Sequence, residues 1–280
     1  MIPVAASIAE VRAAVRAAGR VAFVPTMGAL HAGHGELVRA ARAITDFVVV
    51  SVFVNPTQFG PNEDYAQYPR TPDADRDLAE AHGASLVFAP SAATMYPDGA
   101  TTFVDIGELG DFLCGPSRPG HFRGVCTVVL KLFNIVQPQV AVFGAKDAQQ
   151  ARIIRRIVRD LNVPVELVVA PTVREPDGLA MSSRNRYLNA RDRANAPKIY
   201  AALQAVRTRV EQGEADVPRL EAGLLADLRA LPGVRVDYAS IVDDDSLQPV
   251  PRIERPALCA AAVFLGATRL IDNITLSPTG

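Results

Sequence analysis

Apolar residues follow two kinds of pattern over the first part of the chain. Runs that are apolar at almost every position are typical of strands buried inside a parallel sheet, and they occur at 21–24, 47–54, 85–89, 140–143 and 165–169. The segments between these runs favour helices, at 8–18, 34–43, 73–82, 124–136 and 147–161. Strands that alternate with helices predict right-handed crossovers and a mostly parallel sheet. Ligands of such sheets bind at the carboxyl ends of the strands, where the unusual loops 25–33 and 55–62 lie.

The pattern changes after about residue 172. Helices are favoured at 192–212 and 217–231, and strands that can pair in a small separate sheet at 234–241, 258–264 and 269–274. We therefore expect a second domain from residue 173 onward. The loop 173–189 is the expected hinge between the two domains.

Composition and charge exclude several classes of protein. The 280 residues carry 29 Lys and Arg against 30 Asp and Glu, and this balance argues against a dedicated nucleic-acid binder. The longest apolar runs fall well short of the roughly 20 residues that a membrane span needs, and the N-terminus lacks the basic leader of a secretory signal. The 3 cysteines cannot all pair and form no CxxC, which argues against a disulfide framework or a zinc site and fits a reducing cytoplasm.

The loop 25–34, Pro-Thr-Met-Gly-Ala-Leu-His-Ala-Gly-His, joins the first of these strands to the next helix. The amides and dipole at a helix start favour an anion, and Gly28 and Gly33 let the chain pass close to a ligand. His31 and His34 are three residues apart and can reach one phosphate group. We interpret the loop as a phosphate site rather than a solvated turn, and no third ligand for a metal is evident.

Two further segments have groups suited to phosphates. In Phe-Gly-Ala-Lys-Asp at 143–147, Lys146 can point at phosphates, and Asp147 is either a helix cap or a ligand-positioning group. Gln150 lies one turn farther along and can face the same pocket. In Met-Ser-Ser-Arg-Asn at 181–185, two hydroxyls and a guanidinium can wrap a polyphosphate, although an ordinary Ser-rich linker has the same composition.

Two other motifs are more ambiguous. In Phe-Val-Asn-Pro-Thr-Gln-Phe at 53–59, Gln58 beside two Phe side chains suits a small ligand with polar and apolar parts. An exposed Gln in a capped turn fits equally well. The arginines of Arg-Pro-Gly-His-Phe-Arg-Gly at 118–124 can serve phosphates, a dimer contact or a surface turn.

Taken together, these motifs resemble the pantothenate synthetases, a family also called pantoate–β-alanine ligases. His31-Ala-Gly-His34 is similar to the HxGH signature of the wider nucleotidyltransferase and class I aminoacyl-tRNA synthetase superfamily. Met181-Ser-Ser-Arg184 is similar to the second, mobile signature of that superfamily. The motifs occur in family order over roughly residues 21 to 190, and the total length also matches.

The resemblance implies an ATP-dependent reaction in two steps. The carboxylate of pantoate attacks the α-phosphate of ATP to give pantoyl adenylate and pyrophosphate, and the amine of β-alanine then displaces AMP to give pantothenate. It also implies Mg²⁺, a homodimer and small-molecule substrates, with no nucleic acid or membrane as partner. The implied fold is α/β, with a Rossmann-like ATP- and pantoate-binding domain at 1–172 and a smaller α+β lid domain at 173–280.

The family's site residues carry over position by position. The resemblance places Gln58 against pantoate and β-alanine and Gln150 against pantoate, and it matches His34 to the proton donor. Adenylation spreads charge over a triphosphate, and His31, His34 and Lys146 are the expected catalytic groups that meet this charge. The implied ATP contacts are Met27, Gly28, Ala29, Leu30, His31, Ala32, Gly33, His34, Gly144, Ala145, Lys146, Asp147, Val173, Met181, Ser182, Ser183 and Arg184. The protein ligands of the metal are left unassigned.

Two positions depart from the family pattern. Ala145 stands where the family more often has Glu, which removes a charge near the phosphates. Gly35 stands where a Leu usually follows the second His, and we expect it to loosen the first turn of the following helix.

Three other functions share part of this pattern. A nucleotidylyltransferase would have the HxGH turn but no reason for the Gln58 and Gln150 pair, and it would form a dinucleotide rather than AMP and an amide. A tRNA synthetase fragment would need a basic domain, and none is evident. A non-catalytic module would bind ATP without releasing pyrophosphate when pantoate and β-alanine are supplied.

Overall fold

The computed structural model describes residues 1–61 and 63–278. The predicted loop 55–62 therefore ends at Asn62, which lies outside the described residues. The chain divides into two compact units. The first comprises Met1–Gly110, Arg118–Ala145 and Gln150–Pro171, and the second comprises Asp111–Ser117, Lys146–Gln149 and Thr172–Gly280.

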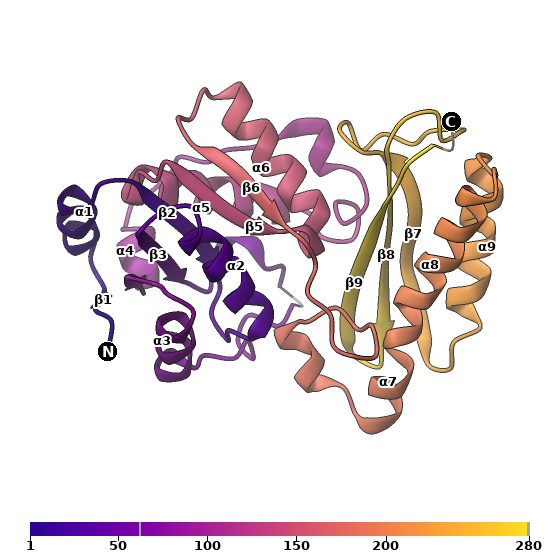
Figure 1. Ribbon diagram of the computed structural model, residues 1–280, viewed down its shortest axis with the longest axis horizontal. Helices are drawn as coiled ribbons and strands as arrows, with labels where there is room; N and C mark the ends of the chain where they lie inside the picture. The colour runs from indigo at the N-terminus through magenta and orange to yellow at the C-terminus, as the bar shows by residue number, and fades with distance from the viewer. Residues whose placement is uncertain (62, 279–280) are drawn as a thin grey trace. The chain divides into compact units, whose positions relative to one another are not determined.

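A six-stranded parallel sheet forms the centre of the first unit in the described part of the chain (Figure 1). Its strands lie in the order β1 (Val4–Ala5), β4 (Leu86–Phe88), β3 (Phe47–Val52), β2 (Val21–Thr26), β5 (Val140–Gly144) and β6 (Glu166–Ala170). The predicted parallel sheet is confirmed. The two-residue β1 is too short to leave a pattern in the sequence. Because β2 lies between β3 and β5, the strand order reverses beside it, and the loop after β2 is at the place where such sheets bind ligands.

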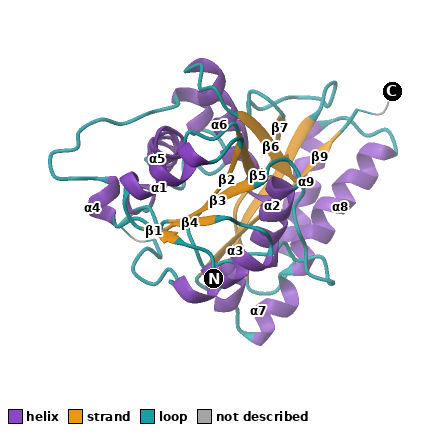
Figure 2. Cartoon of the chain, turned by 60° about the vertical axis from the view of Figure 1, so that its left-hand side comes forward, coloured by secondary structure: helices purple, strands orange, loops and turns teal. Residues whose placement is uncertain are grey.

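Helices cover both faces of this sheet (Figure 2). Alternate side chains of a strand point to opposite faces, so Phe23 packs in a cluster with α1, α5 and α6, while Val24 packs with α2 and α3. Burial on both faces explains why the strands are apolar at nearly every position. The helices of the first unit include α1 (Ile8–Ala17), α2 (Ala32–Arg42), α3 (Pro72–Ala81), α4 (Ala92–Met95), α5 (His121–Val136) and α6 (Ala148–Asp160), with 3-10 turns at Pro56–Gln58 and Gly107–Gly110.

The second unit has a smaller antiparallel sheet. Its described strands follow the order β7 (Val234–Asp243), β8 (Ala257–Leu265) and β9 (Thr268–Leu276), which confirms the predicted small sheet. Its helices include α7 (Ala190–Asn195), α8 (Pro197–Glu211) and α9 (Val217–Arg229). The predicted continuous helix 192–212 is wrong. The helix is interrupted before Pro197, because proline has no amide hydrogen to continue the ladder and fits the first position of a new helix.

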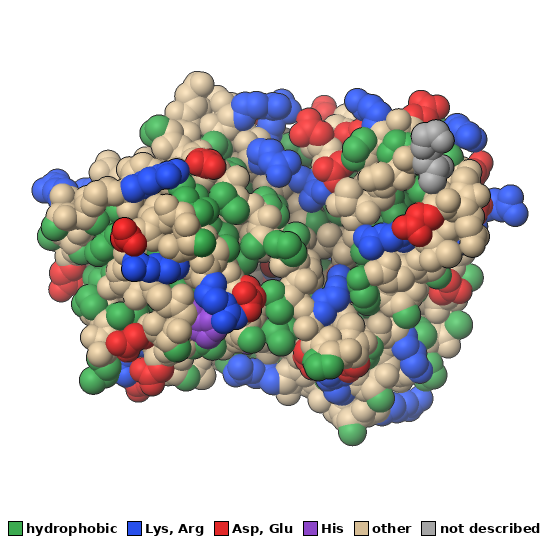
Figure 3. Space-filling view, viewed as in Figure 1, with side chains coloured by type: hydrophobic (Ala, Val, Ile, Leu, Met, Phe, Trp, Pro, Cys, Tyr) green, Lys and Arg blue, Asp and Glu red, His purple; other side chains and the backbone are tan. Residues whose placement is uncertain are grey.

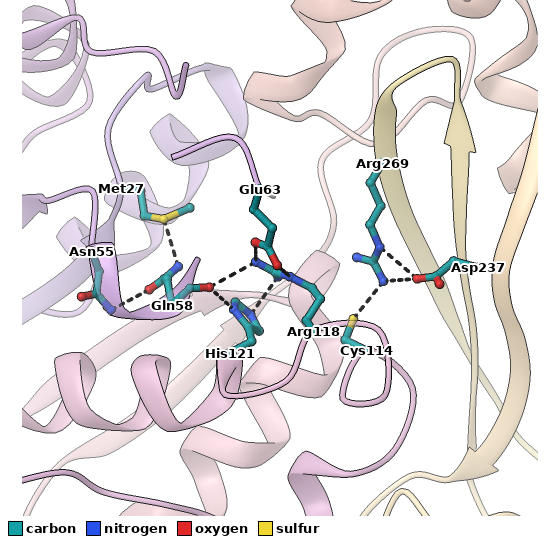
Figure 4. Close-up of polar contacts among 9 residues, drawn as sticks. All are labelled: Met27, Asn55, Gln58, Glu63, Cys114, Arg118, His121, Asp237 and Arg269. Carbon is teal, nitrogen blue, oxygen red and sulfur yellow. Dashed lines mark hydrogen bonds and ion pairs between the residues drawn. The ribbon is translucent and has the colours of Figure 1, made fainter. Parts of the chain in front are cut away.

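Two short segments, 111–117 and 146–149, belong to the second unit, although the sequence analysis placed them in the first domain. The side chain of Gln149 ties them together, since it accepts from the amide of Cys114 at 3.0 Å and donates to the carbonyl of Phe112 at 2.7 Å. The segment 111–117 also contacts the sheet, where Arg269 lies 2.7 Å from Asp237 and 3.5 Å from the sulfur of Cys114 (Figure 4). These contacts join residues far apart in the chain, so a local pattern does not reveal them.

The surface agrees with the balanced charge. On the face in Figure 3, basic and acidic side chains are interspersed, as the net charge of −1 leads one to expect. Within residues 1–61 and 63–278, no helix combines the length and the apolar character that crossing a membrane requires.

Candidate active site

The loop after β2 is a tightly held turn. The hydroxyl of Thr26 donates to the carbonyl of Ser51 at 2.6 Å and accepts from the amide of Gly28 at 3.1 Å. Gly28 and Ala29 both have left-handed backbone conformations, with φ of 85° and 50°. A side chain at Gly28 would place its Cβ 2.9 Å from Asp75 and from Val52. The turn therefore requires glycine at this position.

His31 and His34 cap α2 together. The Nδ1 atom of His31 accepts from the amide of Gly33 at 3.2 Å, and Nδ1 of His34 accepts from the amide of His31 at 3.3 Å. Because Nδ1 is an acceptor in each ring, the neutral imidazoles carry their hydrogen on Nε2. The sequence analysis expected amides at this helix start to receive an anion, but those of Gly33 and His34 donate within the turn. The imidazole Nε2–H groups are the donors suited to a phosphate.

The ring of His82 packs against Gly35. A Cβ at this position would lie 2.4 Å from Nε2 of His82, whose ring is held by a contact of 2.8 Å between Nδ1 and the carbonyl of Leu78. The His82 ring therefore occupies the space of the absent side chain. The expectation that Gly35 loosens the first turn overlooked this contact, since His82 lies on another helix end.

The 3-10 turn Pro56–Gln58 places Gln58 in the interior with 8% of its surface exposed. The alternative of an exposed Gln in a capped turn is therefore wrong. Its neighbour Asn55 is 1% exposed and donates through Nδ2 to Oε1 of Gln58 at 3.1 Å and to the carbonyl of Gly124 at 3.2 Å. The Oδ1 atom of Asn55 accepts from the amide of Thr57 and, at 2.8 Å, from the hydroxyl of Tyr96.

These contacts determine the orientation of the Gln58 amide. A backbone carbonyl only accepts and a backbone amide only donates, so Gly124 and Thr57 together fix which end of Asn55 is the donor. Asn55 then holds the oxygen of Gln58, and the Gln58 nitrogen points the other way, 3.0 Å from the sulfur of Met27 (Figure 4). Gln58 thus has its NH₂ group beside the turn after β2.

A second network holds the main chain of Gln58. Arg118 donates to Nε2 of His121 at 2.9 Å, so the hydrogen of His121 is on Nδ1 and bonds to the carbonyl of Gln58 at 2.8 Å (Figure 4). Arg118 also pairs with Glu63 at 2.6 Å. Burial opposes ionisation of Glu63, but the hydrogen bonds and charge of Arg118 outweigh it and hold its pKa below the ordinary value. These contacts give Arg118 a structural role, because it helps to hold the main chain of Gln58.

The close approach of α5 makes these contacts possible. A Cβ at Gly124 would lie 2.4 Å from the carbonyl oxygen of Thr57, so only glycine lets the helix come this near. Cys126, in the same helix, is fully buried. Burial, aided by the charge of Asp105, raises the pKa of its thiol to about 12. Cys126 is therefore no thiolate nucleophile at neutral pH.

The segment 144–147 passes from one unit to the other. Gly144 ends β5, and Ala145, Lys146 and Asp147 form a 3-10 turn before α6. The Lys146 ammonium is 3.9 Å from the Asp147 carboxylate, and the Lys146 carbonyl accepts from Asn273 at 2.9 Å. Lys146 and Asp147 belong to the second unit, and Gln150 to the first, where it is half-buried.

The segment 173–189 is anchored in the second unit. Leu179 lies in its apolar core, and Arg193 pairs with Glu175 at 2.5 Å and Asp177 at 2.6 Å. Met181 donates its amide to the carbonyl of Val173 at 2.9 Å. Ser182 caps the 3-10 helix Ser183–Tyr187 by accepting from the amide of Arg184 at 3.3 Å, and Ser183 is buried.

The predicted site residues therefore divide between the units. The first holds Met27, Gly28, Ala29, Leu30, His31, Ala32, Gly33, His34, Gln58, Gly144, Ala145 and Gln150, and the second holds Lys146, Asp147, Val173, Met181, Ser182, Ser183 and Arg184. Sequence reasoning assigned no role to Asn55, Tyr96 or Asp75. Asn55 was visible inside the motif 53–59, whereas Tyr96 and Asp75 gave no signal.

The described residues contain no group of three or more His, Cys, Asp or Glu side chains placed to hold a metal ion. Comparison with known proteins decides the family. The sequence model of the Pantoate-beta-alanine ligase family matches residues 3–275. The chain belongs to the pantoate–β-alanine ligase family. Its activity is that of a carbon–nitrogen ligase that joins pantoate to β-alanine.

Relatives in this family match over nearly the whole chain. The pantothenate synthetase of Roseiflexus castenholzii is 55% identical over 275 residues, covering 98% of this chain and 99% of the relative. That of Thermosipho africanus is 54% identical over 256 residues, covering 91% and 92%.

Solved structures of the pantoate–β-alanine ligase family confirm the Rossmann-like first domain and the smaller C-terminal domain. The pantothenate synthetase of Thermus thermophilus superposes with a TM-score of 0.95 at 48% identity, covering 99% of this chain and 100% of that one. The pantoate-beta-alanine ligase of Francisella tularensis, solved with beta-gamma ATP and beta-alanine, has a TM-score of 0.79 at 34% identity, covering 100% and 99%.

Proposed function

We propose that the chain uses ATP to condense (R)-pantoate with β-alanine through a pantoyl-adenylate intermediate. In the first step, a pantoate carboxylate oxygen bonds to the α-phosphorus as the bond to pyrophosphate breaks. In the second, the β-alanine nitrogen bonds to the acyl carbon, the bond to AMP breaks and the amine loses a proton. The observation that carries the proposal is the fixed amide of Gln58, which has its NH₂ group beside the turn of Met27.

Gln58 is the proposed contact for pantoate and β-alanine, and Gln150 the second contact for pantoate. An amide N–H donates to a carboxylate without supplying a full opposite charge, and we infer that the carboxylate stays more nucleophilic than it would in an ion pair. The Asn55 bond supports this role, since it engages the Gln58 oxygen and turns the NH₂ group toward Met27.

The charge that develops on the phosphates needs donors and cations. We propose that His31, His34 and Lys146 supply them, with His34 as the proton donor and Arg184 as a further cation. The Nε2–H tautomer that the α2 cap imposes on both imidazoles supports this assignment. The full set of proposed ATP contacts is Met27, Gly28, Ala29, Leu30, His31, Ala32, Gly33, His34, Gly144, Ala145, Lys146, Asp147, Val173, Met181, Ser182, Ser183 and Arg184.

Mg²⁺ is proposed to enter as the magnesium complex of ATP. In such sites the ion is held largely by substrate phosphates and water, with few protein ligands, and we assign none here. We further propose a homodimer. We also propose a cytoplasmic location, because buried free cysteines such as Cys114, Cys126 and Cys259 fit a reducing compartment. The division of roles between an ATP- and pantoate-binding domain at 1–172 and a lid at 173–280 also stays a prediction.

Pyrophosphate–ATP exchange tests the mechanism. We expect labelled pyrophosphate to enter ATP when pantoate and Mg²⁺ are present and β-alanine is absent, because the adenylate forms before the amine is needed. Exchange that requires β-alanine would contradict the two-step route. Product analysis with all substrates separates the other classes, since a dinucleotide would indicate a nucleotidylyltransferase and bound but unreacted ATP a non-catalytic module.

A further inference from the structure

The carboxylate of Asp75 lies directly beneath the turn after β2. Asp75 is in the first turn of α3 and is 1% exposed. Its Oδ2 atom accepts from the amide of Ala29 at 3.0 Å, and Oδ1 accepts from the amide of Leu30 at 2.7 Å. The hydroxyl of Thr71 donates to Oδ1 at 2.9 Å. One buried carboxylate thus receives three hydrogen bonds, two of them from the turn.

The turn has a conformation that requires such support. Ala29 has a φ of 50°, which is uncommon for a residue with a side chain and persists where the surroundings enforce it. Asp75 accepts hydrogen bonds from the amides of Ala29 and Leu30, so the carboxylate binds the turn at Ala29, the residue with the uncommon φ. At Gly28 even a methyl group would come within 2.9 Å of Oδ2. The turn therefore packs directly against the Asp75 carboxylate.

The chemistry of the contact calls for a carboxylate. Three donors converge on two oxygen atoms that only accept when ionised, and hydrogen bonds to a charged acceptor are the stronger kind. The amide of Asp75 donates to the carbonyl of Thr71 at 2.8 Å, which places the negative charge at the N-terminus of α3, where the helix dipole favours it. The isosteric amide of Asn has one accepting oxygen, and its NH₂ group would face an N–H donor.

We propose that Asp75 is a positioning residue for the adenylation step. By holding Ala29 and Leu30, it sets the path of the chain into the cap of α2, and through it the positions of His31 and His34. Asp75 touches no substrate. The inference rests on the proposed function, because the imidazoles it positions act on the phosphates of ATP in the first step and not on β-alanine in the second.

The two half-reactions, measured separately, test this role. Adenylation is followed by pyrophosphate–ATP exchange with pantoate, and amide formation by the reaction of supplied pantoyl adenylate with β-alanine. At saturating ATP, we expect Asp75→Asn to lower exchange by about 10²-fold, the scale that follows from a misplacement of about 1 Å. At saturating pantoyl adenylate, we expect amide formation to be unchanged within error. The matched control is Asp73→Asn, the same change in the same helix at an exposed side chain, and it should alter neither rate.

Equal losses in both half-reactions would mean that Asp75 only supports the fold, and unchanged exchange would remove the role altogether. If Asp75→Asn fails to fold, Thr71→Val decides, since it deletes one donor and leaves the carboxylate. It should lower exchange by a smaller factor with amide formation intact, and no change in exchange would overturn the inference. A wild-type protein that neither exchanges pyrophosphate nor consumes the adenylate would instead contradict the proposed function.

Discussion

His31 and His34 hold each other at the start of α2, with ring centroids 4.1 Å apart and the amide of His31 bonded to Nδ1 of His34. Each imidazole therefore has two functions on two different atoms. The Nδ1 atoms close the helix cap, and the Nε2–H groups are the proposed donors to ATP. A substitution that keeps an acceptor at the Nδ1 position and removes the donor at Nε2 separates the capping of α2 from the proposed catalytic role.

His34→Asn and His34→Ala make this separation. Asn keeps an acceptor near the position of Nδ1 but has nothing at Nε2, whereas Ala has neither. We expect both to lower kcat by about 10²- to 10³-fold, as loss of one donor to developing charge does, with little change in KM for ATP. Only Ala should also lose the cap, which is worth about 1 kcal/mol of stability. Unchanged kcat with a raised KM for ATP would show that His34 binds only the ground state.

Gln58 offers a test of amide orientation. In Gln58→Glu, one carboxylate oxygen still accepts from Asn55, but the other replaces the NH₂ group and repels the carboxylate of pantoate. We expect Gln58→Ala to lower kcat/KM for pantoate by about 10- to 100-fold, the value of a hydrogen bond to a charged group, and Gln58→Glu to lower it further. Steady-state kinetics at saturating ATP measures this. A Glu variant more active than Ala would mean that the amide presents its oxygen.

Lys146 tests the need for a compact cation. We expect Lys146→Ala to reduce turnover strongly, because it removes a charge proposed to act on the phosphates. Lys146→Arg should restore it only in part, since a planar guanidinium does not replace an ammonium at the same point. Exchange rates of both variants give the comparison, and an Arg variant with wild-type turnover would contradict the placement.

Gly35 and His82 are expected to be coupled in stability. Gly35→Ala should destabilise the fold by about 1 kcal/mol, because overpacking costs about 1–3 kcal/mol and the helix propensity of Ala returns only about 1 kcal/mol. His82→Ala should remove the clash, so the double variant becomes more stable than the sum of the single changes. Denaturant unfolding of the double-mutant cycle measures the coupling. Additive effects would indicate that the ring simply moves aside.

Glu63 should make the fold sensitive to acid. Its pKa is lower in the folded state than the ordinary 4.5, since Arg118 favours the ionised form against burial. Ionised Glu63 therefore stabilises the fold above pH 4.5, and this contribution is lost as pH falls toward the lower folded-state pKa. Glu63→Gln should lose less Tm than wild type between about pH 5 and about pH 3. An equal fall in Tm for wild type and Glu63→Gln across this pH range would exclude the Glu63–Arg118 pair as a source of acid sensitivity.

The sequence predicted features that depend on near neighbours. The apolar run of β3 indicated a buried parallel strand because its residues pack on one face or the other. It did not predict the carboxylate beneath Ala29, because Asp75 is 46 residues away and its helix carries other acidic residues with no such contact. The orientation of Gln58 was hidden for the same reason, since it depends on Gly124, 69 residues from Asn55.

The segment 111–117 has a consequence for biosynthesis. Its partners are made late: Asp237 follows Ser117 by 120 residues, and Arg269 follows Cys114 by 155. At the usual pace of translation this delay is on the order of 10 s, during which α5, β5 and α6 emerge behind it. The segment 111–117 therefore leaves the ribosome long before the sheet that it contacts has been synthesised. A fragment cut at residue 172 would keep this segment without its sheet, and the side chains of Cys114 and Ser117 would lack their native partners.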